Sequence, residues 1–259
     1  MSLLLRTTAL MLLLLSRAPA MAAVPLTTNS TEDNREESQQ NEVSSKLFRH
    51  SLSGLYGIAN QNYPIVQPYQ DFDVLYSKAH QAQIELETLC KSTALLTHTQ
   101  AYFAGTKSRQ RALEKVELEL DGQAERITDL ARATIVANDV ASLVTAYETL
   151  SREATVVKVK NRFKNPAESG YRDLNVLVQL PKTGIIAEVQ LHLAAIAQVK
   201  SGAEHELYEQ IQTIERTARQ EQRELTEWEN AQIAKMRSAS RDLYQQAWQP
   251  YITTHIQAA

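Results

Sequence analysis

The sequence predicts an α+β protein, in which a mixed β-sheet is flanked by helices and followed by a long C-terminal helix. Helix-favouring residues dominate the chain of 259 residues, which has only 7 Gly and 7 Pro and is 43% hydrophobic. Three β-rich runs follow one another in its middle, and its last part keeps a helical hydrophobic period. The length allows one substantial core, and a formal net charge of -3 gives no overall attraction for DNA.

The first 22 residues have the pattern of a cleavable signal peptide. Arg6 precedes an apolar run at 9–15, and small residues near Ala20 and Ala22 suit a signal peptidase. The apolar run is shorter than the roughly 20 residues that span a bilayer, and an uncleaved anchor is the alternative. We therefore expect a secreted or periplasmic protein that keeps no membrane span after cleavage.

Residues 23–50 are predicted to be a disordered spacer, because this stretch is polar and lacks long aliphatic runs. Residues 51–200 would form the folded domain. Its helical period begins at Asp71, and a second helix is expected at 108–120 with Ser108 as its N-cap.

The hydrophobic period then changes to that of strands. A β-rich run ends the stretch 126–137, and a helix follows with Asp139 near its start. Three further strand candidates come in close succession, at 154–163, 172–180 and 183–193. This order of elements predicts a mixed sheet backed by helices.

A helical extension is predicted for residues 201–259, where a hydrophobic stripe runs from Leu207 to Leu243. One helix of roughly 45 residues would be about 70 Å long, too long to pack wholly on a small sheet. It would protrude, pack on the early helices, or pair as a coiled coil with a second copy in a homo-oligomer. A helix that breaks and folds back is an equal alternative, although we identify no cap before Pro250.

Two acidic residues lie in strand candidates, Asp129 and Glu188, each followed by apolar residues that should anchor it in the sheet. Carboxylates on neighbouring strands can share Mg²⁺, with phosphate oxygens completing the coordination shell. The chain has 30 acidic residues, so spacing alone favours two solvated surface acids.

Basic residues gather in two places. One group surrounds the start of the helix at 108–120, where backbone N–H groups favour phosphate: Lys107, Arg109, Arg111 and Lys115. The other is expected on one face of a strand, by alternation: Lys158, Lys160 and Arg162. Together with Asp129 and Glu188, these cations suit a polyphosphate that is bound with its metal. If the two acids are left aside, a basic face exposed to solvent is an equally good interpretation.

Several short motifs occur in a fixed order along the chain: “TKSRQRALEK” from Thr106, “DLA” from Asp129, Lys160, “KNPAESGYRDLN” from Lys164, “AEVQL” from Ala187 and “AEHELY” from Ala203. In order and spacing, they resemble the synthetase domain of RelA/SpoT-type alarmone enzymes over about residues 76–214. The resemblance implies a nucleotidyltransferase-like fold and a pyrophosphokinase that uses Mg²⁺. Pyrophosphate would pass from ATP to the 3′-hydroxyl of an acceptor, which is GDP or GTP, another nucleotide, or an RNA 3′ end.

The same resemblance implies roles for individual residues. Asp129 and Glu188 would bind the metal, and Glu188 would also help to activate the attacking hydroxyl. The ATP side would comprise Lys107, Lys115, Arg109 and Arg132. The acceptor side would comprise Lys160, Arg162, Tyr171, Asn175, Gln190 and His205, with the acceptor base stacked on the ring of Tyr171.

The chain also departs from the family pattern. The usual Asp-Leu-Ala-Gly-x-Arg has its arginine two residues early, at Arg132, and Thr106 and Asn175 replace an expected arginine and histidine. None of the six His residues is followed by Asp, so the hydrolase motif of longer members is missing. These departures indicate a divergent synthetase and leave its acceptor open.

Two functions remain open at this point. An exported pyrophosphokinase must reach ATP, most simply inside another cell, which favours a secreted toxin or effector. The alternative is a non-catalytic nucleotide-binding or protein-interaction module of the same fold, acting through the C-terminal helix.

Overall fold

The computed structural model describes residues 44–63 and 65–253, and these contain a six-stranded mixed sheet of order β1-β4-β5-β6-β3-β2. The strands are β1 (Gln61–Asn62), β2 (Gln100–Tyr102), β3 (Arg132–Ala137), β4 (Thr155–Asn161), β5 (Leu174–Gln179) and β6 (Ile186–Leu193). β3 and β6 are parallel, and every other neighbouring pair is antiparallel. The predicted α+β class is confirmed, and of these six strands only β1 and β2, with two and three residues, were not predicted.

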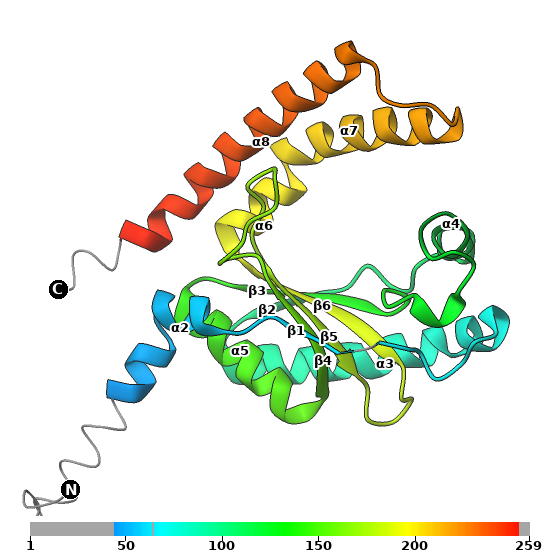
Figure 1. The fold of residues 1–259 in the computed structure, drawn as a ribbon. Coiled ribbons are helices and arrows are strands. Elements are labelled where there is room, and N and C mark those ends of the chain that lie inside the picture. Colours follow the sequence, from blue (N-terminus) through cyan, green and yellow to red (C-terminus); the bar gives the residue numbers. More distant parts are fainter. Residues whose placement is uncertain (1–43, 64, 254–259) are drawn as a thin grey trace, which may run out of the picture. The chain divides into compact units, whose positions relative to one another are not determined.

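Helices lie on both sides of the sheet (Figure 1). They are α2 (Leu52–Gly57), α3 (Phe72–Thr97), α4 (Arg109–Glu119), α5 (Val140–Glu153), α6 (Ala194–Ser201), α7 (Ala203–Gln220) and α8 (Glu227–Thr253). α3 and α5 cover one face, and α6, α7 and α8 lie on the other side (Figure 1). Asp71, Ser108 and Asp139 each accept a hydrogen bond from the backbone N–H three residues later, which confirms the predicted helix starts.

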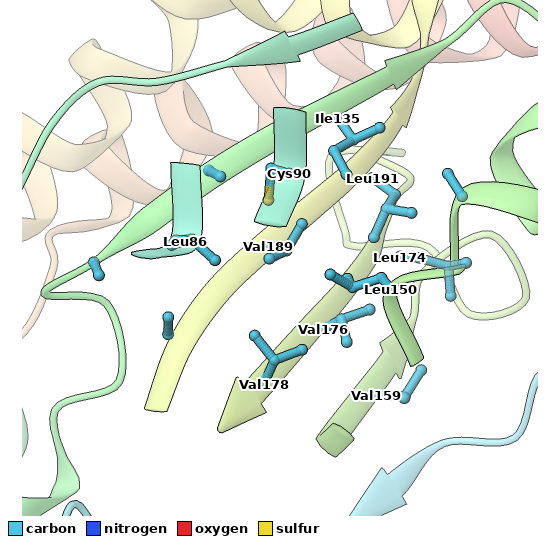
Figure 2. Packing of buried hydrophobic residues seen from close by; sticks show 14 of the residues in the cluster. Leu86, Cys90, Ile135, Leu150, Val159, Leu174, Val176, Val178, Val189 and Leu191 are labelled. Atoms are coloured by element: carbon cyan, nitrogen blue, oxygen red, sulfur yellow. The ribbon is translucent and has the colours of Figure 1, made fainter. Parts of the chain in front are cut away.

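The main core lies between the sheet and the helices α3 and α5. Figure 2 shows side chains of three central strands, β3, β5 and β6, packed together with Leu86 and Cys90 of α3 and with Leu150 of α5. Because side chains alternate along a strand, the residues between these core residues lie on the opposite face of the sheet, where polar side chains can be accommodated. Burial raises the pKa of the Cys90 thiol to about 12, so this side chain packs as a protonated, apolar group.

The C-terminal periodic stretch is not one continuous helix, so the prediction of a single helix of roughly 45 residues is wrong. α7 ends at Gln220, Gln222 has a positive φ of 51°, and α8 then provides the predicted long C-terminal helix. Thr226 and Glu229 form a capping box, in which each backbone N–H donates to the other side chain, at 2.8 and 3.2 Å. The alternative of a break is thus confirmed, and a Thr-x-x-Glu signal for it is present in the sequence.

The predicted signal peptide and most of the predicted spacer lie outside the described residues. The end of the spacer prediction is wrong, because residues 44–49 are helical and His50 Nε2 lies 3.2 Å from Glu148 Oε2 on α5. No helix within 44–63 and 65–253 is long and apolar enough to cross a membrane.

Candidate active site

Asp129 is held between two lysines at the start of β3. It precedes the strand rather than lying within it, so its predicted place in a strand is wrong. Lys107 Nζ and Lys115 Nζ donate to the same oxygen, Oδ2, at 2.8 and 2.9 Å. The N-cap Ser108 starts α4 between these two lysines, and the Lys107 N–H donates to the Leu130 carbonyl at 3.0 Å, so helix and loop are tied together.

The second oxygen of Asp129, Oδ1, is buried and has no hydrogen-bond partner among the described residues. Burial alone would raise the pKa of this carboxyl, but Lys107 and Lys115 outweigh it and hold the pKa below its usual range. Asp129 is therefore ionised at neutral pH. With two cations for one carboxylate, the cluster keeps a net positive charge that attracts phosphate.

Glu188 lies at the same end of the sheet, on the parallel neighbour β6. Its Cα is paired with that of Arg132, and its N–H donates to the Ala131 carbonyl at 3.1 Å. Its Oε1 accepts hydrogen bonds from Asn175 Nδ2 at 2.5 Å and Gln190 Nε2 at 3.4 Å. Oε2 has no partner in the described part of the chain, so each of the two acids presents one unengaged oxygen.

Three residues predicted on the acceptor side form a row across the sheet, on the face opposite the main core. Lys160, Asn175 and Gln190 are register neighbours on β4, β5 and β6. Gln190 Oε1 accepts a hydrogen bond from Lys200 Nζ of α6 at 2.6 Å. The sequence analysis missed Lys200, which stands in no motif of its own and reaches the site only because α6 packs against β6.

Tyr171 lies in the loop before β5, and its hydroxyl belongs to a buried polar network. It donates to Asp173 Oδ2 at 2.8 Å and lies 2.5 Å from His192 Nε2. Burial, together with the cations Lys200 and Arg162, lowers the pKa of His192 to about 3, so the imidazole is neutral. Asp173 and His192 were not predicted, and only their place in the fold identifies them.

Arg162 follows β4 in a turn, so its predicted place on a strand face with Lys158 and Lys160 is wrong. Its guanidinium donates two hydrogen bonds to Asp173, at 2.6 and 2.7 Å, and lies 5.1 Å from the Tyr171 ring centroid. Burial opposes its charge, but Asp173 raises the pKa of Arg162, so the guanidinium stays charged, whereas burial raises the pKa of the Asp173 carboxyl.

A cleft of about 1040 Å³ lies between α4 and α7. Lys107, Lys115 and Asp129 line it. α7 also contributes to the lining, with the acids Glu209 and Glu215 and with five residues that share one helical face: His205, Tyr208, Gln212, Arg216 and Arg219. His205 was predicted on the acceptor side, but it lines this cleft together with the lysines of the predicted ATP side. The cleft has the size of a nucleotide-binding site.

The structure does not bring the two predicted ATP-side arginines to this cleft. Arg109 donates to Asp73 of α3 at 2.6 Å, whereas its neighbour Arg111 lines the cleft. The Arg132 backbone is held by the Gln83 side chain, at 3.0 and 3.2 Å, and its Nε is buried without a partner among the described residues.

Asp129 fits a magnesium ion in one respect that the structure shows directly. A buried, unpartnered carboxylate oxygen, Asp129 Oδ1, is the donor type that Mg²⁺ prefers. No group of three or more His, Cys, Asp or Glu side chains is arranged as a metal site in the described ranges. Phosphate oxygens and water would have to supply the remaining ligands.

Comparison with known proteins finds one family model and one curated relative that are similar to this chain. Residues 105–218, somewhat less than half of the chain, match the family model described as a region found in RelA / SpoT proteins. A curated relative, the (p)ppApp synthetase toxin Tas1 of Pseudomonas aeruginosa (strain UCBPP-PA14), is 31% identical over 121 residues. The match covers 47% of this chain and 27% of that protein, so the chain spans about a quarter of the length of this relative.

Two solved structures show the same fold. The Type VI effector Tas1, crystallised with its immunity protein, has a TM-score of 0.50 and 24% identity, with 68% of this chain and 96% of that chain covered. Small alarmone synthetase 2 from Bacillus subtilis has a TM-score of 0.51 and 16% identity, with 69% and 94% covered. The predicted fold of the alarmone synthetases is thereby confirmed.

Proposed function

We propose that this protein transfers a pyrophosphoryl group from ATP to the 3′-hydroxyl of an acceptor nucleotide. A bond forms between the acceptor oxygen and the β-phosphorus of ATP, the bond to the α-phosphate oxygen breaks, and AMP leaves. The observation that carries the proposal is the carboxylate of Asp129 between Lys107 and Lys115, with one buried oxygen unpartnered beside the strand that bears Glu188. The match of residues 105–218 to the RelA / SpoT family model supports it.

The donor half of the reaction would use the lysine pair. Lys107 and Lys115 can turn from Asp129 to the phosphates, where their charge stabilises the negative charge that develops during transfer. Asp129 Oδ1 and Glu188 Oε2 would hold Mg²⁺, which supplies charge neutralisation for the phosphates when it is bound.

The acceptor half would use Glu188 as the group that takes the proton from the 3′-hydroxyl. Asn175 and Gln190 both donate to its Oε1, which orients the carboxylate and leaves Oε2 to face the reactants. Tyr171 would place the acceptor base, as the family resemblance implies.

We propose an adenine nucleotide as the first acceptor to test, because the curated relative is a (p)ppApp synthetase. GDP, GTP and an RNA 3′ end are the other candidates. The relative is also a toxin, which supports the proposal of a secreted toxin or effector that acts where ATP is abundant.

The test is a transfer assay with γ-labelled ATP, Mg²⁺ and this panel of acceptors. We expect label to reach one acceptor, and we expect Glu188→Gln to lower kcat by about 10³-fold, because the acid that accepts the proton is lost. Glu153→Gln, an exposed change at the end of α5, is the matched control. If no acceptor is labelled, or if Glu188→Gln equals the parent, the enzyme proposal fails and a binding module becomes the better interpretation.

A further inference from the structure

One face of α8 lies along the loop that carries Tyr171. We call residues 162–173 the acceptor loop, and we define the α8 stripe as Arg237, Arg241, Tyr244 and Trp248. Their spacing of four, three and four residues places them on one side of the helix. α8 lies wholly outside residues 105–218, so these contacts are additional to the matched domain.

The C-terminal end of the stripe packs against both ends of the acceptor loop. The Arg172 guanidinium lies 5.1 Å from the ring centroid of Trp248, and the ring of Phe163 lies 5.5 Å from the same centroid. Trp248 and Phe163 are 3% and 1% exposed, so water is excluded from this contact. Such burial makes Trp248 the anchor of the helix on the loop.

The centre of the stripe touches the loop backbone at Gly170. This glycine has a φ of +80°, and a Cβ atom there would lie only 3.2 Å from Arg241 Cα and 3.4 Å from Tyr244 Cβ. A side chain at this position would therefore crowd the helix by a few tenths of an ångström and would adopt a strained backbone conformation.

Tyr244 joins the acceptor loop to the start of α7. Its ring meets the Tyr171 ring edge-on, with centroids 5.6 Å apart, and its hydroxyl donates to Glu204 Oε2 at 2.9 Å. Ser240, one turn earlier on α8, donates to the other oxygen of Glu204 at 3.3 Å. Tyr244 is 1% exposed, so its position is determined by packing on every side.

The N-terminal end of the stripe binds the loop through Glu168. Arg237 Nη1 lies 2.7 Å from the Glu168 carboxylate, and Arg241 Nη1 donates to the Glu168 carbonyl at 3.3 Å. Exposed pairs of this kind contribute little stability individually. These two contacts hold Glu168 of the acceptor loop against α8, as the buried contacts hold the other parts of the loop.

We propose that the α8 stripe is a positioning element for the acceptor nucleotide: it holds the acceptor loop, and with it the Tyr171 ring, in the orientation that the acceptor base requires. This inference rests on the proposed function. No residue of the stripe lines the cleft between α4 and α7, although Arg237 Nη2 lies 3.1 Å from Oε1 of Glu215, which does line it. Changes at Tyr244 should therefore not affect the ATP side. Loss of the Tyr244 contacts should weaken acceptor binding and leave ATP binding unchanged.

The first test needs no activity. Hydrogen exchange is measured by mass spectrometry on the full chain for the parent, Tyr244→Leu, Tyr244→Phe and a control, Gln245→Leu, on the exposed side of α8. We expect Tyr244→Leu to speed exchange in residues 162–173 and not in α4 or β3. Tyr244→Phe, which keeps the ring contact, should resemble the parent. Arg241→Ala provides a second variant at an exposed position that keeps the pair of Arg237 with Glu215, in case Tyr244→Leu does not fold.

The second test measures KM for ATP and for the best acceptor separately. We expect Tyr244→Leu to raise the acceptor KM about tenfold or more while the ATP KM stays within about twofold, because misplacement affects one substrate only. An equal change in both KM values, no change in either, or unaltered exchange in the loop overturns the role of α8. If the parent itself transfers to no acceptor, the proposed function has failed, and this proposal fails with it.

Discussion

Asp129 and Glu188 share one arrangement at the scale of single residues. In each carboxylate one oxygen is engaged by neighbouring side chains, and the other accepts no hydrogen bond from the described residues. The engaged oxygen fixes the orientation of the group, and the unengaged one is available to a metal or a proton. Orientation by surrounding hydrogen bonds is the usual means by which proteins prepare metal-binding carboxylates.

A buried glutamine, Gln67, ties together the two chain segments that carry these acids. Its Nε2 donates to the carbonyls of Ile127 and Ile186, at 2.7 and 2.9 Å, and its Oε1 accepts from the Ile186 N–H at 2.9 Å. Ile127 and Ile186 each lie two residues before an acid. Gln67 therefore holds Asp129 and Glu188 in register with each other.

We expect Gln67→Ala to lower the free energy of unfolding by about 3 kcal/mol, because three buried backbone groups lose their partner. Gln179→Ala is the control, since Gln179 is exposed and makes one hydrogen bond of 3.3 Å to Gly184. Urea unfolding measures both. A loss below about 1 kcal/mol for Gln67→Ala would show that water replaces the amide.

His192 should make stability depend on pH. Its pKa is about 3 in the folded chain, below the usual 6.5, so between these values the unfolded state binds a proton that the folded state does not. The contribution is fully present above pH 6.5 and is lost as the pH falls toward about 3. We expect a loss of about 2 kcal/mol between about pH 6.5 and pH 5.

The measurement is urea unfolding at several pH values, for the parent and for His192→Gln. The variant should lose this part of the slope, whereas the same change at the exposed His80 should keep it. Parallel slopes for the parent and His192→Gln would contradict the buried neutral imidazole.

At the scale of elements, the N-caps of α4 and α5 affect different properties: the first lies at the site, and the second stabilises a helix away from it. α4 starts at Ser108, between the two lysines of the site, while α5 starts at Asp139 and packs on the far face of the sheet. The Asp139 cap is the stronger one, with a hydrogen bond of 2.7 Å to the Ser142 N–H, against 3.4 Å from the Arg111 N–H to Ser108.

Two cap variants separate stability from binding. Asp139→Ala should lower the free energy of unfolding by about 1 kcal/mol and leave ATP affinity unchanged. Ser108→Ala should cost less stability but weaken ATP binding, because it loosens the helix start that places Lys107. Urea unfolding and calorimetric titration with ATP and Mg²⁺ test the pair, and weaker ATP binding by Asp139→Ala alone would contradict this division.

At the scale of the whole molecule, the predicted signal peptide in residues 1–22 predicts export of the protein. If the first 22 residues are a cleavable signal, the full chain produced in a bacterium should appear in the periplasm or medium, with a mass that starts near residue 21 or 23. Leu13→Arg, which puts a charge into the apolar run, should keep the protein in the cytoplasm. An uncleaved chain in the membrane fraction would instead support the anchor.

Local patterns in the sequence were sufficient for most elements and for the two acids. Asp71, Ser108 and Asp139 mark helix starts, and the alternating runs of β4, β5 and β6 mark strands, because caps and alternation depend on residues a few positions apart. The break after α7 also has a local signal, the capping box of Thr226 and Glu229. The sequence analysis missed it because the hydrophobic stripe continues through this segment and favours one continuous helix. β1 and β2 are too short to show a period.

The sequence alone thus determined the α+β class, the order of the main elements and the identity of Asp129, Glu188, Lys107 and Lys115 as candidates. Only the tertiary structure showed that Asp173, His192 and Lys200 surround Tyr171, that Gln67 joins the acid-bearing segments, and that α8 packs on the acceptor loop. The physical reason is distance along the chain. Tyr171 and Tyr244 meet because separate helices and strands pack together, and no local pattern encodes a contact between residues so far apart.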